Sequence, residues 1–513
     1  MLVPNSVSVT DEQRKALAAL LRKIAPVADE LGRRFAAAGH ELALVGGPVR
    51  DMFLGRTSPD LDLTTDAPPE LVTKIVEGWA DGIWKIGIEF GTIGVRKGSW
   101  TLEITTYRSE EYDPRSRKPV VRYGSSLPGD LSRRDFTVNA MAIRLPGHEL
   151  ADPFGGLADL RARVLRTPGR PEDSFGDDPL RMMRAARFTS QLDFQVTPEV
   201  RAAMTDMAGR IEIVSAERVR DELTKLMLAP DPVPGIELLT RTGVFGVVLP
   251  EVPRMRLEVD EHHRHKDVYR HSLTVLRQAI GLEERYGLSG DLVLRLAALM
   301  HDIGKPKTRS KLPDGRVAFH HHEMVGAAMA RSRLRTLRFP REVATDVADL
   351  IGLHLRFHGY GTGEWTDSAV RRYVRDAGKQ LNRLHALTRA DCTTRNKAKA
   401  DRLSRAYDAL ERDIARLAAE EEINKLRPDL DGNEIMRVLG LKPGPEVGRA
   451  YEFLLNLRIE RGPLGKEEAT GELLRWARDE GMLGGDRGGG THADGGGRDG
   501  TDADDGGRDD GTG

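Results

Sequence analysis

The sequence has few of the features that mark secreted or membrane proteins. Its 513 residues contain one cysteine, Cys392, so no disulfide can form within the chain, and this suits a reducing compartment. No apolar run approaches the ~20 residues that a membrane-spanning helix needs. Residues 1–17 do not combine a basic start with an apolar core, so we expect no secretion signal. Together these absences predict a cytoplasmic protein.

Aromatic residues are scarce, and the net charge is close to zero. A content of 5% aromatic and 39% hydrophobic residues is typical of a helix-rich protein, and the length predicts several domains. The net charge of −1 is distributed unevenly along the chain. Residues 486–513 contain eight Asp and three Arg, a net charge of −5, so the rest of the chain has a net charge of +4. The basic remainder weakly favours an acidic partner such as RNA. The Gly/Asp tail is too polar to pack, so we expect it to be disordered.

Residues 42–67, LALVGGPVRDMFLGRTSPDLDLTTDA, contain the first candidate site. An apolar strand breaks at Gly46-Gly47, and a short helical segment with Arg50 follows. In the next strand, Asp60 and Asp62 alternate with leucines and project from one face. Two adjacent carboxylates repel each other unless a cation lies between them, which indicates Mg2+, and the glycines and arginine suit a polyphosphate. Each fragment alone is typical of a turn or a solvated strand end, but their order favours the functional interpretation.

The following stretches add polar candidates. Residues 82–108 alternate like paired strands, and Glu103 in the last of them is either a third carboxylate of the metal site or part of a cross-strand ion pair. Residues 109–132 are polar and rich in Ser, Pro and Arg, which favours a loop. Residues 133–140, RRDFTVNA, are expected to open a helix. Its first turns carry three side chains that suit a ribose or phosphate: Arg134, Asp135 and Asn139.

Residues 177–188, DDPLRMMRAARF, indicate base recognition. They place Asp178, Arg181, Arg184 and Arg187 at spacings of three along one side of a helix. A carboxylate beside a guanidinium accepts the amine and bare ring nitrogen of cytosine or adenine, and rejects the carbonyl and ring N–H of guanine or uracil. A salt bridge on a solvated helix is the alternative. Further on, Ser215 is expected to cap a helix that holds Arg218, with a mainly structural role.

A different pattern begins near residue 262. Histidines and aspartates lie inside apolar helical segments, where they cost desolvation energy unless they are paired or bind a metal. Any one of them alone is more typical of a buried residue with a hydrogen-bond partner than of a metal ligand. The series consists of His271, His301, Asp302, His322, His354 and Asp391. The neighbouring His320, His321 and His358 are further candidate ligands.

These motifs, in this order, resemble two known families. The stretches LVGGPVRDMFLG…DLDLTT, RRDFTVNAMA and DDPLRMMRAARF are similar to class II tRNA nucleotidyltransferases (CCA-adding enzymes) and bacterial poly(A) polymerases. The later series resembles the HD metal-dependent phosphohydrolases. The resemblance implies an α+β fold, with a small mixed-sheet nucleotidyltransferase head followed by all-helical neck, body, HD and C-terminal regions.

The resemblance also implies roles for the residues. Asp60 and Asp62 would hold catalytic Mg2+ ions. The residues that would bind the nucleotide are Gly46, Gly47, Arg50, Arg134, Asp135, Asn139, Asp178, Arg181, Arg184 and Arg187. At the HD site, His271, His301, Asp302 and Asp391 would hold a divalent metal of unknown identity, with His322 and His354 as second-site or phosphate-binding groups. The implied activity is addition of C, C and A to tRNA from CTP and ATP. The alternatives are a polymerase that adds only A and an HD phosphohydrolase with an RNA-binding head.

The same comparison of motifs suggests domain boundaries. The expected regions are an N-terminal helix (1–39), the head (40–150), the neck and body (151–261), the HD domain (262–395), a C-terminal helical region (396–483) and the tail (484–513).

Overall fold

The computed structural model describes residues 11–56, 60–85, 88, 91–111, 120–124, 126–256, 267–314, 317–359, 365–393, 396–421 and 427–483. The predicted disorder of residues 484–513 falls outside these ranges. The chain forms two compact units. The first comprises Met1–Glu364 with Asp376–Leu410, and the second comprises Trp365–Arg375 with Glu411–Gly513.

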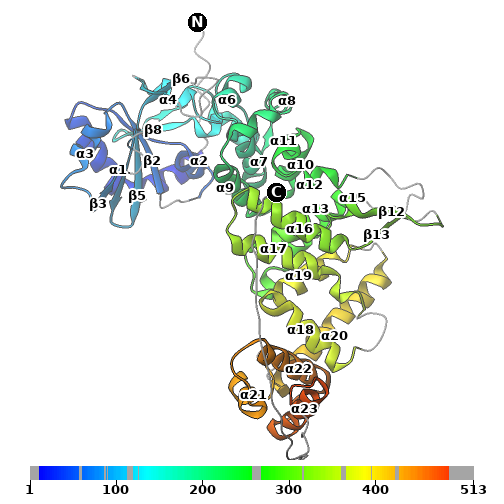
Figure 1. Ribbon diagram of the computed structural model, residues 1–513. Helices are drawn as coiled ribbons and strands as arrows, with labels where there is room; N and C mark the ends of the chain where they lie inside the picture. The colour runs from blue at the N-terminus through cyan, green and yellow to red at the C-terminus, as the bar shows by residue number, and fades with distance from the viewer. Residues whose placement is uncertain are drawn as a thin grey trace, which may run out of the picture. The chain divides into compact units, whose positions relative to one another are not determined.

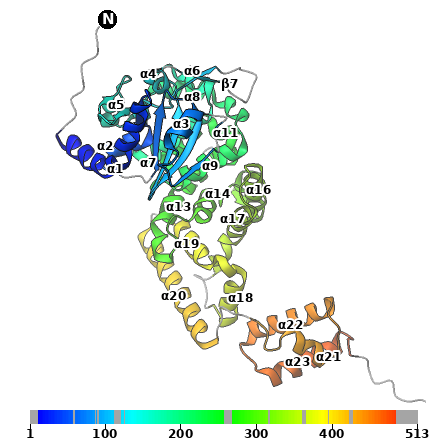
Figure 2. The same cartoon turned by 90° about the vertical axis from the view of Figure 1, so that its left-hand side faces the viewer.

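The first unit begins with a seven-stranded mixed sheet, seen most clearly in Figure 2. The strand order is β3-β4-β5-β2-β1-β8-β9, in which only β2 and β5 run parallel. The central β1 is apolar and buried at all four positions, as expected of a strand covered on both faces. The strands are β1 Leu42–Val45, β2 Asp60–Thr65, β3 Gly82–Trp84, β4 Thr92–Lys97, β5 Trp100–Thr106, β8 Ala142–Leu145 and β9 Leu150–Ala151.

Helices pack around this sheet. The predicted N-terminal helix is present as α1, which packs on β1, β8 and α2. The helical elements of the head are α1 Asp11–Ala37, α2 Gly47–Phe53, α3 Pro69–Val76, α4 Leu127–Ser132 and the 3-10 turn η2 Thr137–Asn139.

Two local predictions for the head are wrong. The expected loop at residues 109–132 contains an antiparallel pair, β6 Arg108–Glu111 with β7 Val120–Tyr123, followed by α4; residues 112–119 of it lie outside the described ranges. The expected helix from residue 133 is a single 3-10 turn that leads into β8. Pairing of β8 with β1 at the centre of the sheet outweighs the helix-start pattern.

A helical neck follows, with α7 at its centre (Figure 1). Helix α7 packs against α9 and α10, and a Cβ at Gly235 of α10 would lie 2.3 Å from the carbonyl oxygen of Ala186. Glycine therefore permits the close approach of α10 to α7. The elements are α5 Gly156–Ala162, β10 Val164–Leu165, α6 Pro171–Asp177, α7 Leu180–Leu192, β11 Gln195–Val196, α8 Pro198–Asp206, η3 Ala208–Ile213, α9 Ala216–Met227, α10 Val233–Arg241, α11 Val244–Val248 and α12 Glu251–Arg254.

The next helices enclose the His/Asp series. Helix α13 packs against α14 and α19, and α17 packs against α14 and α16. The elements are α13 Val268–Leu282, η4 Glu284–Tyr286, α14 Leu292–Met300, α15 Lys305–Thr308, β12 Arg309–Lys311, β13 Val317–Phe319, α16 His322–Thr336, α17 Arg341–Leu353, η5 His354–Gly359, α18 Asp367–Ala377, η6 Gly378–Gln380, α19 Leu381–Asp391 and α20 Lys397–Glu421. The α+β prediction is confirmed, and the helical part also contains the small pairs β10–β11 and β12–β13.

The second unit is helical. Parts of α18 and α20 belong to it, together with α21 Gly432–Leu439, α22 Pro445–Arg461 and α23 Lys466–Asp479. Its core is aliphatic, with Phe453 stacked on Trp476 at 4.9 Å between ring centroids. No helix in the described ranges is both long enough and apolar enough to cross a bilayer.

Candidate functional site

Three carboxylates lie on adjacent parallel strands of the head sheet. Asp60 and Asp62 alternate with buried leucines on β2, and the register with β5 places Glu103 opposite Asp62. Burial raises the pKa of Asp62; Arg134 opposes this shift, while Glu103 and Asp60 add to it. A divalent cation would relieve that repulsion, and carboxylate oxygens are preferred ligands of Mg2+. These carboxylates are therefore candidate ligands of a divalent cation.

The turn between β1 and α2 lies beside these carboxylates. Gly46 has a φ of 75°, and a Cβ there would lie 3.0 Å from Nη1 of Arg134 and 3.7 Å from Oδ2 of Asp62. Glycine is therefore required both for the backbone conformation and for the close approach. Arg50 of α2 is buried, and its Nη1 donates to Oδ1 of Asn139 at 2.7 Å.

The η2 segment connects this turn to the neck. Asp135 is buried and accepts hydrogen bonds from Asn139 Nδ2 (2.9 Å) and Arg184 Nε (2.8 Å). Burial alone would raise the pKa of Asp135, but Arg184 and Asn139 outweigh that effect and lower it to about 2. Asp135 thus stays ionised and holds Arg184 of α7 against the head.

The residues predicted to read the base lie side by side without bonding through their side chains. Asp178 precedes α7, and its Oδ2 accepts from Nη2 of Arg218 at 2.7 Å. Arg181 donates to Ser174 Oγ (2.9 Å) and to the carbonyl oxygen of Arg133 (2.5 Å). Within the described ranges, the alternative interpretation, a salt bridge between Asp178 and Arg181, is therefore not observed, and each side chain has separate partners.

All the head and neck candidates except Asp60 line one cavity of about 500 Å3. Seven arginines and four carboxylates line it, and four of these arginines also pair with carboxylates outside the lining: Arg50 with Asp51, Arg133 and Arg134 with Asp130, and Arg187 with Glu222. Such a cavity suits a polyanion carried by a metal ion. The lining residues used in this argument are Gly46, Gly47, Arg50, Asp62, Glu103, Arg133, Arg134, Asp135, Asn139, Asp178, Arg181, Arg184, Arg187, Phe188 and Arg218.

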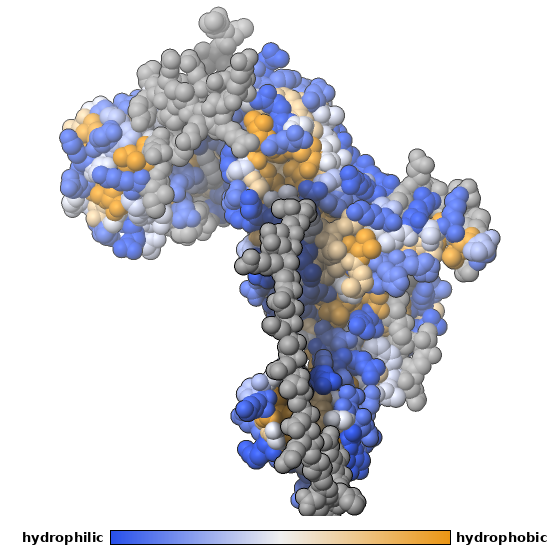
Figure 3. Space-filling model, viewed as in Figure 1, coloured by the Kyte–Doolittle hydropathy of each residue, from blue (hydrophilic) through white to orange (hydrophobic). Residues whose placement is uncertain are grey.

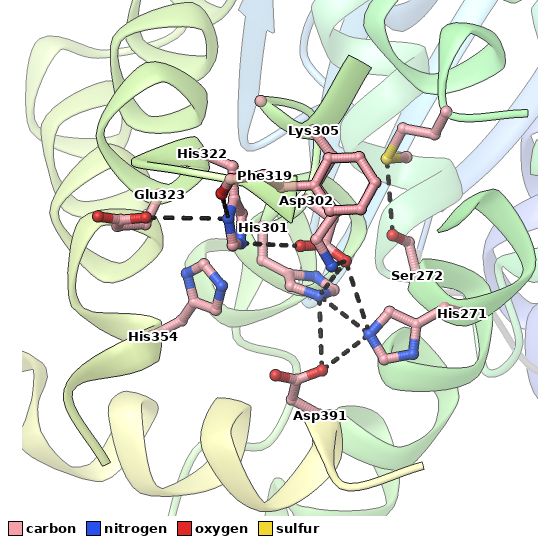
Figure 4. Close-up of polar contacts among 12 residues, drawn as sticks. His271, Ser272, His301, Asp302, Lys305, Phe319, His322, Glu323, His354 and Asp391 are labelled. Carbon is pink, nitrogen blue, oxygen red and sulfur yellow. Dashed lines mark hydrogen bonds and ion pairs between the residues drawn. The ribbon is translucent and has the colours of Figure 1, made fainter. Parts of the chain in front are cut away.

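The six residues of the His/Asp series converge from α13, α16, α19, the 3-10 turn η5 and the turn that follows α14 (Figure 4). They form two groups, each with ligand atoms within 4.8 Å of one another: His271, His301 and Asp391, and Asp302, His322 and His354. Oδ2 of Asp302 also lies 3.3 Å from Nε2 of His301, so its carboxylate lies between the groups. We call these six residues the HD cluster.

Backbone contacts orient three imidazoles of the HD cluster in the same way. Nδ1 of His301, His322 and His354 each lies within 2.9 Å of the carbonyl oxygen three residues earlier. If Nδ1 carries the proton, Nε2 is left as the metal ligand. His320 and His321 are exposed and belong to neither group, and the side chain of His358 lies outside the described part of the chain.

The electrostatics of the HD cluster also fit divalent metals. Burial would lower the pKa of His301, but Asp302 and Asp391 raise it to about 9. Burial and His301 together lower the pKa of His354 to about 4. Asp302 Oδ1 and His322 Nε2 are buried and face each other at 3.4 Å, and neither atom forms a hydrogen bond with another described residue. Buried polar atoms of this kind are expected where a metal binds.

Sequence and structure comparisons agree with this organisation. Residues 42–166 match the "Poly A polymerase head domain", 193–255 match the "Probable RNA and SrmB- binding site of polymerase A", and 268–396 match the "HD domain". The chain is 35% identical to an A-adding tRNA nucleotidyltransferase of Deinococcus radiodurans, over 85% of this chain and 96% of that one. It is 33% identical to a CC-adding tRNA nucleotidyltransferase of Thermus thermophilus, over 84% and 93% of the two chains. The chain belongs to the tRNA nucleotidyltransferase family.

Other members extend the likeness. A CCA-adding enzyme of Streptococcus thermophilus is 31% identical over 85% of this chain and 92% of its own. In fold, this tRNA nucleotidyltransferase resembles the CCA-adding enzyme of Bacillus stearothermophilus in complex with CTP, with a TM-score of 0.64, 24% identity and coverage of 90% and 98% of the two chains.

One site residue of this tRNA nucleotidyltransferase was missed in the expected loop. Asp130 of α4 is fully buried, and it accepts from Arg133 Nη2 (2.6 Å), Arg134 Nη2 (3.1 Å) and Thr64 Oγ1 (3.3 Å). Burial would raise the pKa of Asp130, but Arg134 and Arg133 hold it below its usual value. Asp130 therefore fixes Arg134, whose Nη1 faces the turn between β1 and α2.

Two more missed residues organise the arginines of α7. Glu222 of α9 is buried, with Oε2 2.8 Å from Nε of Arg187. The ring of Phe188 has the guanidiniums of Arg50, Arg184 and Arg187 at 5.1, 5.5 and 4.3 Å from its centroid. Glu222 lies four residues after Arg218, on the same face of α9, and that spacing is the one sequence signal for it.

The Asp135–Arg184 pair predicts a pH dependence of stability. Folding lowers the pKa of Asp135 from its ordinary value of 3.8 to about 2. The ionised Asp135 therefore stabilises the fold fully above the unfolded pKa, and this stabilisation is lost as the pH falls towards 2. Between pH 5 and pH 2 the wild type should lose about 2 kcal/mol of unfolding free energy that Asp135→Asn does not lose. Urea unfolding across this range measures the difference. Asp193→Asn, which changes an exposed aspartate, should follow the wild type; parallel curves for all three proteins would contradict the assignment.

Proposed function

We propose that this protein is a CCA-adding tRNA nucleotidyltransferase, which adds C, C and A to the 3′ end of tRNA from CTP and ATP. The observation that supports the proposal is one cavity lined by the carboxylates Asp62 and Glu103, by seven arginines and by Asp178. In the reaction, the RNA 3′ oxygen attacks the α-phosphorus, and the bond to the bridging oxygen of pyrophosphate breaks. A cytoplasmic location follows from this substrate, and the domain boundaries given above belong to the same proposal.

Asp62 in the cavity and Asp60 beside it on β2 would hold Mg2+, with Glu103 as a third carboxylate. When bound, the metal would increase the nucleophilicity of the 3′-hydroxyl and stabilise charge on the leaving pyrophosphate. The chain's own residues position the triphosphate. Arg134, fixed by Asp130, and Arg50, fixed by Asn139, present guanidiniums beside the β1–α2 turn.

At the other end, Asp178 and Arg181 would read the base. Asp178 offers an acceptor for the exocyclic amine of cytosine or adenine, and Arg181 offers donors to the bare ring nitrogen. Arg218 already donates to Oδ2 of Asp178, so a base amine must share or displace that contact. We therefore assign Arg218 to the nucleotide site, in addition to the structural role expected from its helix.

The relatives set the main alternative, because they include an A-adding and a CC-adding protein as well as CCA-adding enzymes. An enzyme that adds only A is the alternative function. All three specificities use nucleotides with the same amine and ring-nitrogen pattern, so Asp178 and Arg181 are compatible with each of them.

Nucleotide addition to defined tRNA ends tests the proposal. With tRNAs that lack all three, the last two or only the last terminal nucleotide, we expect C, C and A in order from a mixture of CTP and ATP. Addition of A alone, or a stop after the second C, would instead assign the partial activity. Asp62→Ala should lower addition at every step by about a thousandfold or more, because several kcal/mol of charge stabilisation depends on the metal site.

We also propose a second activity, metal-dependent hydrolysis of phosphate esters at the HD cluster. The observation that favours it is the pair of ligand groups joined by Asp302. Two metals at such a site would activate a water molecule and bind a phosphate oxygen. Lys305, whose Nζ lies 2.6 Å from Oδ2 of Asp302, brings a cation to the same place.

The two sites should act independently, since their residues come from separate stretches of chain. His301→Ala with Asp302→Ala should abolish hydrolysis of p-nitrophenyl phosphate and leave nucleotide addition unchanged. His320→Ala, which changes an exposed neighbour, should keep both activities. Melting curves must accompany the assays, because emptying a buried metal site can loosen its helices. Loss of nucleotide addition in a well-folded double variant would contradict the independence of the sites.

A further inference from the structure

A short hairpin with basic side chains begins and ends at the HD cluster. Helix α15 follows His301 and Asp302 directly, and β12 and β13 return the chain to His322. Residues 305–314, which include α15 and β12, contain four basic residues: Lys305, Lys307, Arg309 and Lys311. Asp314 is the one acidic residue in this range. Figure 3 shows hydrophilic residues together with a small hydrophobic patch at the right-hand edge of the view, where this hairpin lies.

Both ends of the hairpin contact the cluster. At one end, Nζ of Lys305 donates to Oδ2 of Asp302 at 2.6 Å. At the other end, the carbonyl oxygen of Phe319 lies 2.9 Å from Nδ1 of His322. Nζ of Lys305 is also 5.8 Å from the centroid of the Phe319 ring, so the two ends meet over Asp302 (Figure 4). The position of the hairpin is therefore fixed relative to the cluster.

The strand register places the other cations on one face with Phe319. Arg309 is paired with Phe319 and Lys311 with Val317, and directly opposed residues of an antiparallel pair share a face. Arg309 and Lys311 are exposed, and neither forms an ion pair with any described residue. A row of cations thus runs along this face, from Lys311 through Arg309 to Lys305 at the metal ligands.

We propose that this row binds the phosphodiester backbone of a single-stranded RNA end and directs its terminal phosphate to the HD cluster. Cations two residues apart on a strand can each meet a phosphate, and an aromatic ring beside them can stack on a base, which is how single strands are commonly bound. The inference rests on the hydrolase activity proposed above and narrows its substrate class. The favoured substrates are oligonucleotides with a 3′-terminal phosphate, in preference to small phosphate esters.

The reaction balances without a further reactant. Water adds to the terminal phosphorus, and the bond between phosphorus and the 3′ oxygen breaks. The 3′ oxygen takes the proton that water loses, so the products are inorganic phosphate and an RNA with a 3′-hydroxyl.

The test compares a long and a short substrate on the full-length protein. Hydrolysis of a 3′-phosphorylated hexaribonucleotide and of a nucleoside 3′-monophosphate is measured with Mg2+, Mn2+, Co2+ or Ni2+. Arg309→Gln with Lys311→Gln should lower kcat/KM for the hexanucleotide by about fivefold to thirtyfold, the effect of losing two exposed charge contacts. It should leave kcat/KM for the mononucleotide unchanged. The salt dependence of the hexanucleotide reaction should also become shallower, since fewer counterions are released on binding.

A matched control removes two exposed lysines of the head, Lys74→Gln with Lys85→Gln, and should leave both substrates unaffected. Equal loss on both substrates, or no loss on the hexanucleotide, would overturn the proposal. If the wild type hydrolyses neither substrate with any of these metals, the proposed hydrolase activity fails. Photocrosslinking of the labelled hexanucleotide then tests RNA binding by the row of cations separately from hydrolysis. Crosslinks to residues 305–319 that are lost in the double variant would support RNA binding there, and the absence of such crosslinks would refute it.

Discussion

The nucleotide cavity depends on carboxylates that are buried together with arginines. Guanidiniums bind phosphate well only when they are held in place, and burying them costs desolvation energy unless each is paired. Asp130 pairs with Arg133 and Arg134, and Asp135 pairs with Arg184. Since both aspartates keep a pKa below the usual value, they stay charged and preserve the arrangement at neutral pH.

These contacts also connect the two ends of the cavity. Asp130 binds Arg134 near Asp62, and through Arg133 it is linked to the carbonyl group that accepts from Arg181. Asp135 joins the head to α7, the helix that carries Arg181 and Arg184. The parts that would hold the triphosphate and the base are therefore fixed by one set of ion pairs rather than by two separate ones.

The sequence predicted those features that depend on neighbouring residues. The Gly46 turn, the strand with Asp60 and Asp62, and the six residues of the HD cluster all follow from local patterns of polar residues within apolar segments. Features that depend on distant pairing were missed. The partner of Asp178 is Arg218, forty residues later, and β8 forms in place of a helix because β1 pairs with it. Asp130 was overlooked because its helix follows a polar stretch that favoured a loop.

The central claim is that Asp178 and Arg181 select the base in a cavity whose other end performs the transfer. The most direct measurement is nucleotide preference after the donor and acceptor are exchanged, by Asp178→Arg with Arg181→Asp. A mispaired base edge costs ~1–3 kcal/mol, so use of CTP and ATP should fall by about tenfold or more relative to UTP and GTP. Asp231→Arg with Arg277→Asp, which exchanges an exposed ion pair, should keep the original preference. If the Asp178/Arg181 exchange leaves a folded, active enzyme that still prefers CTP and ATP, these residues do not read the base and the account is wrong.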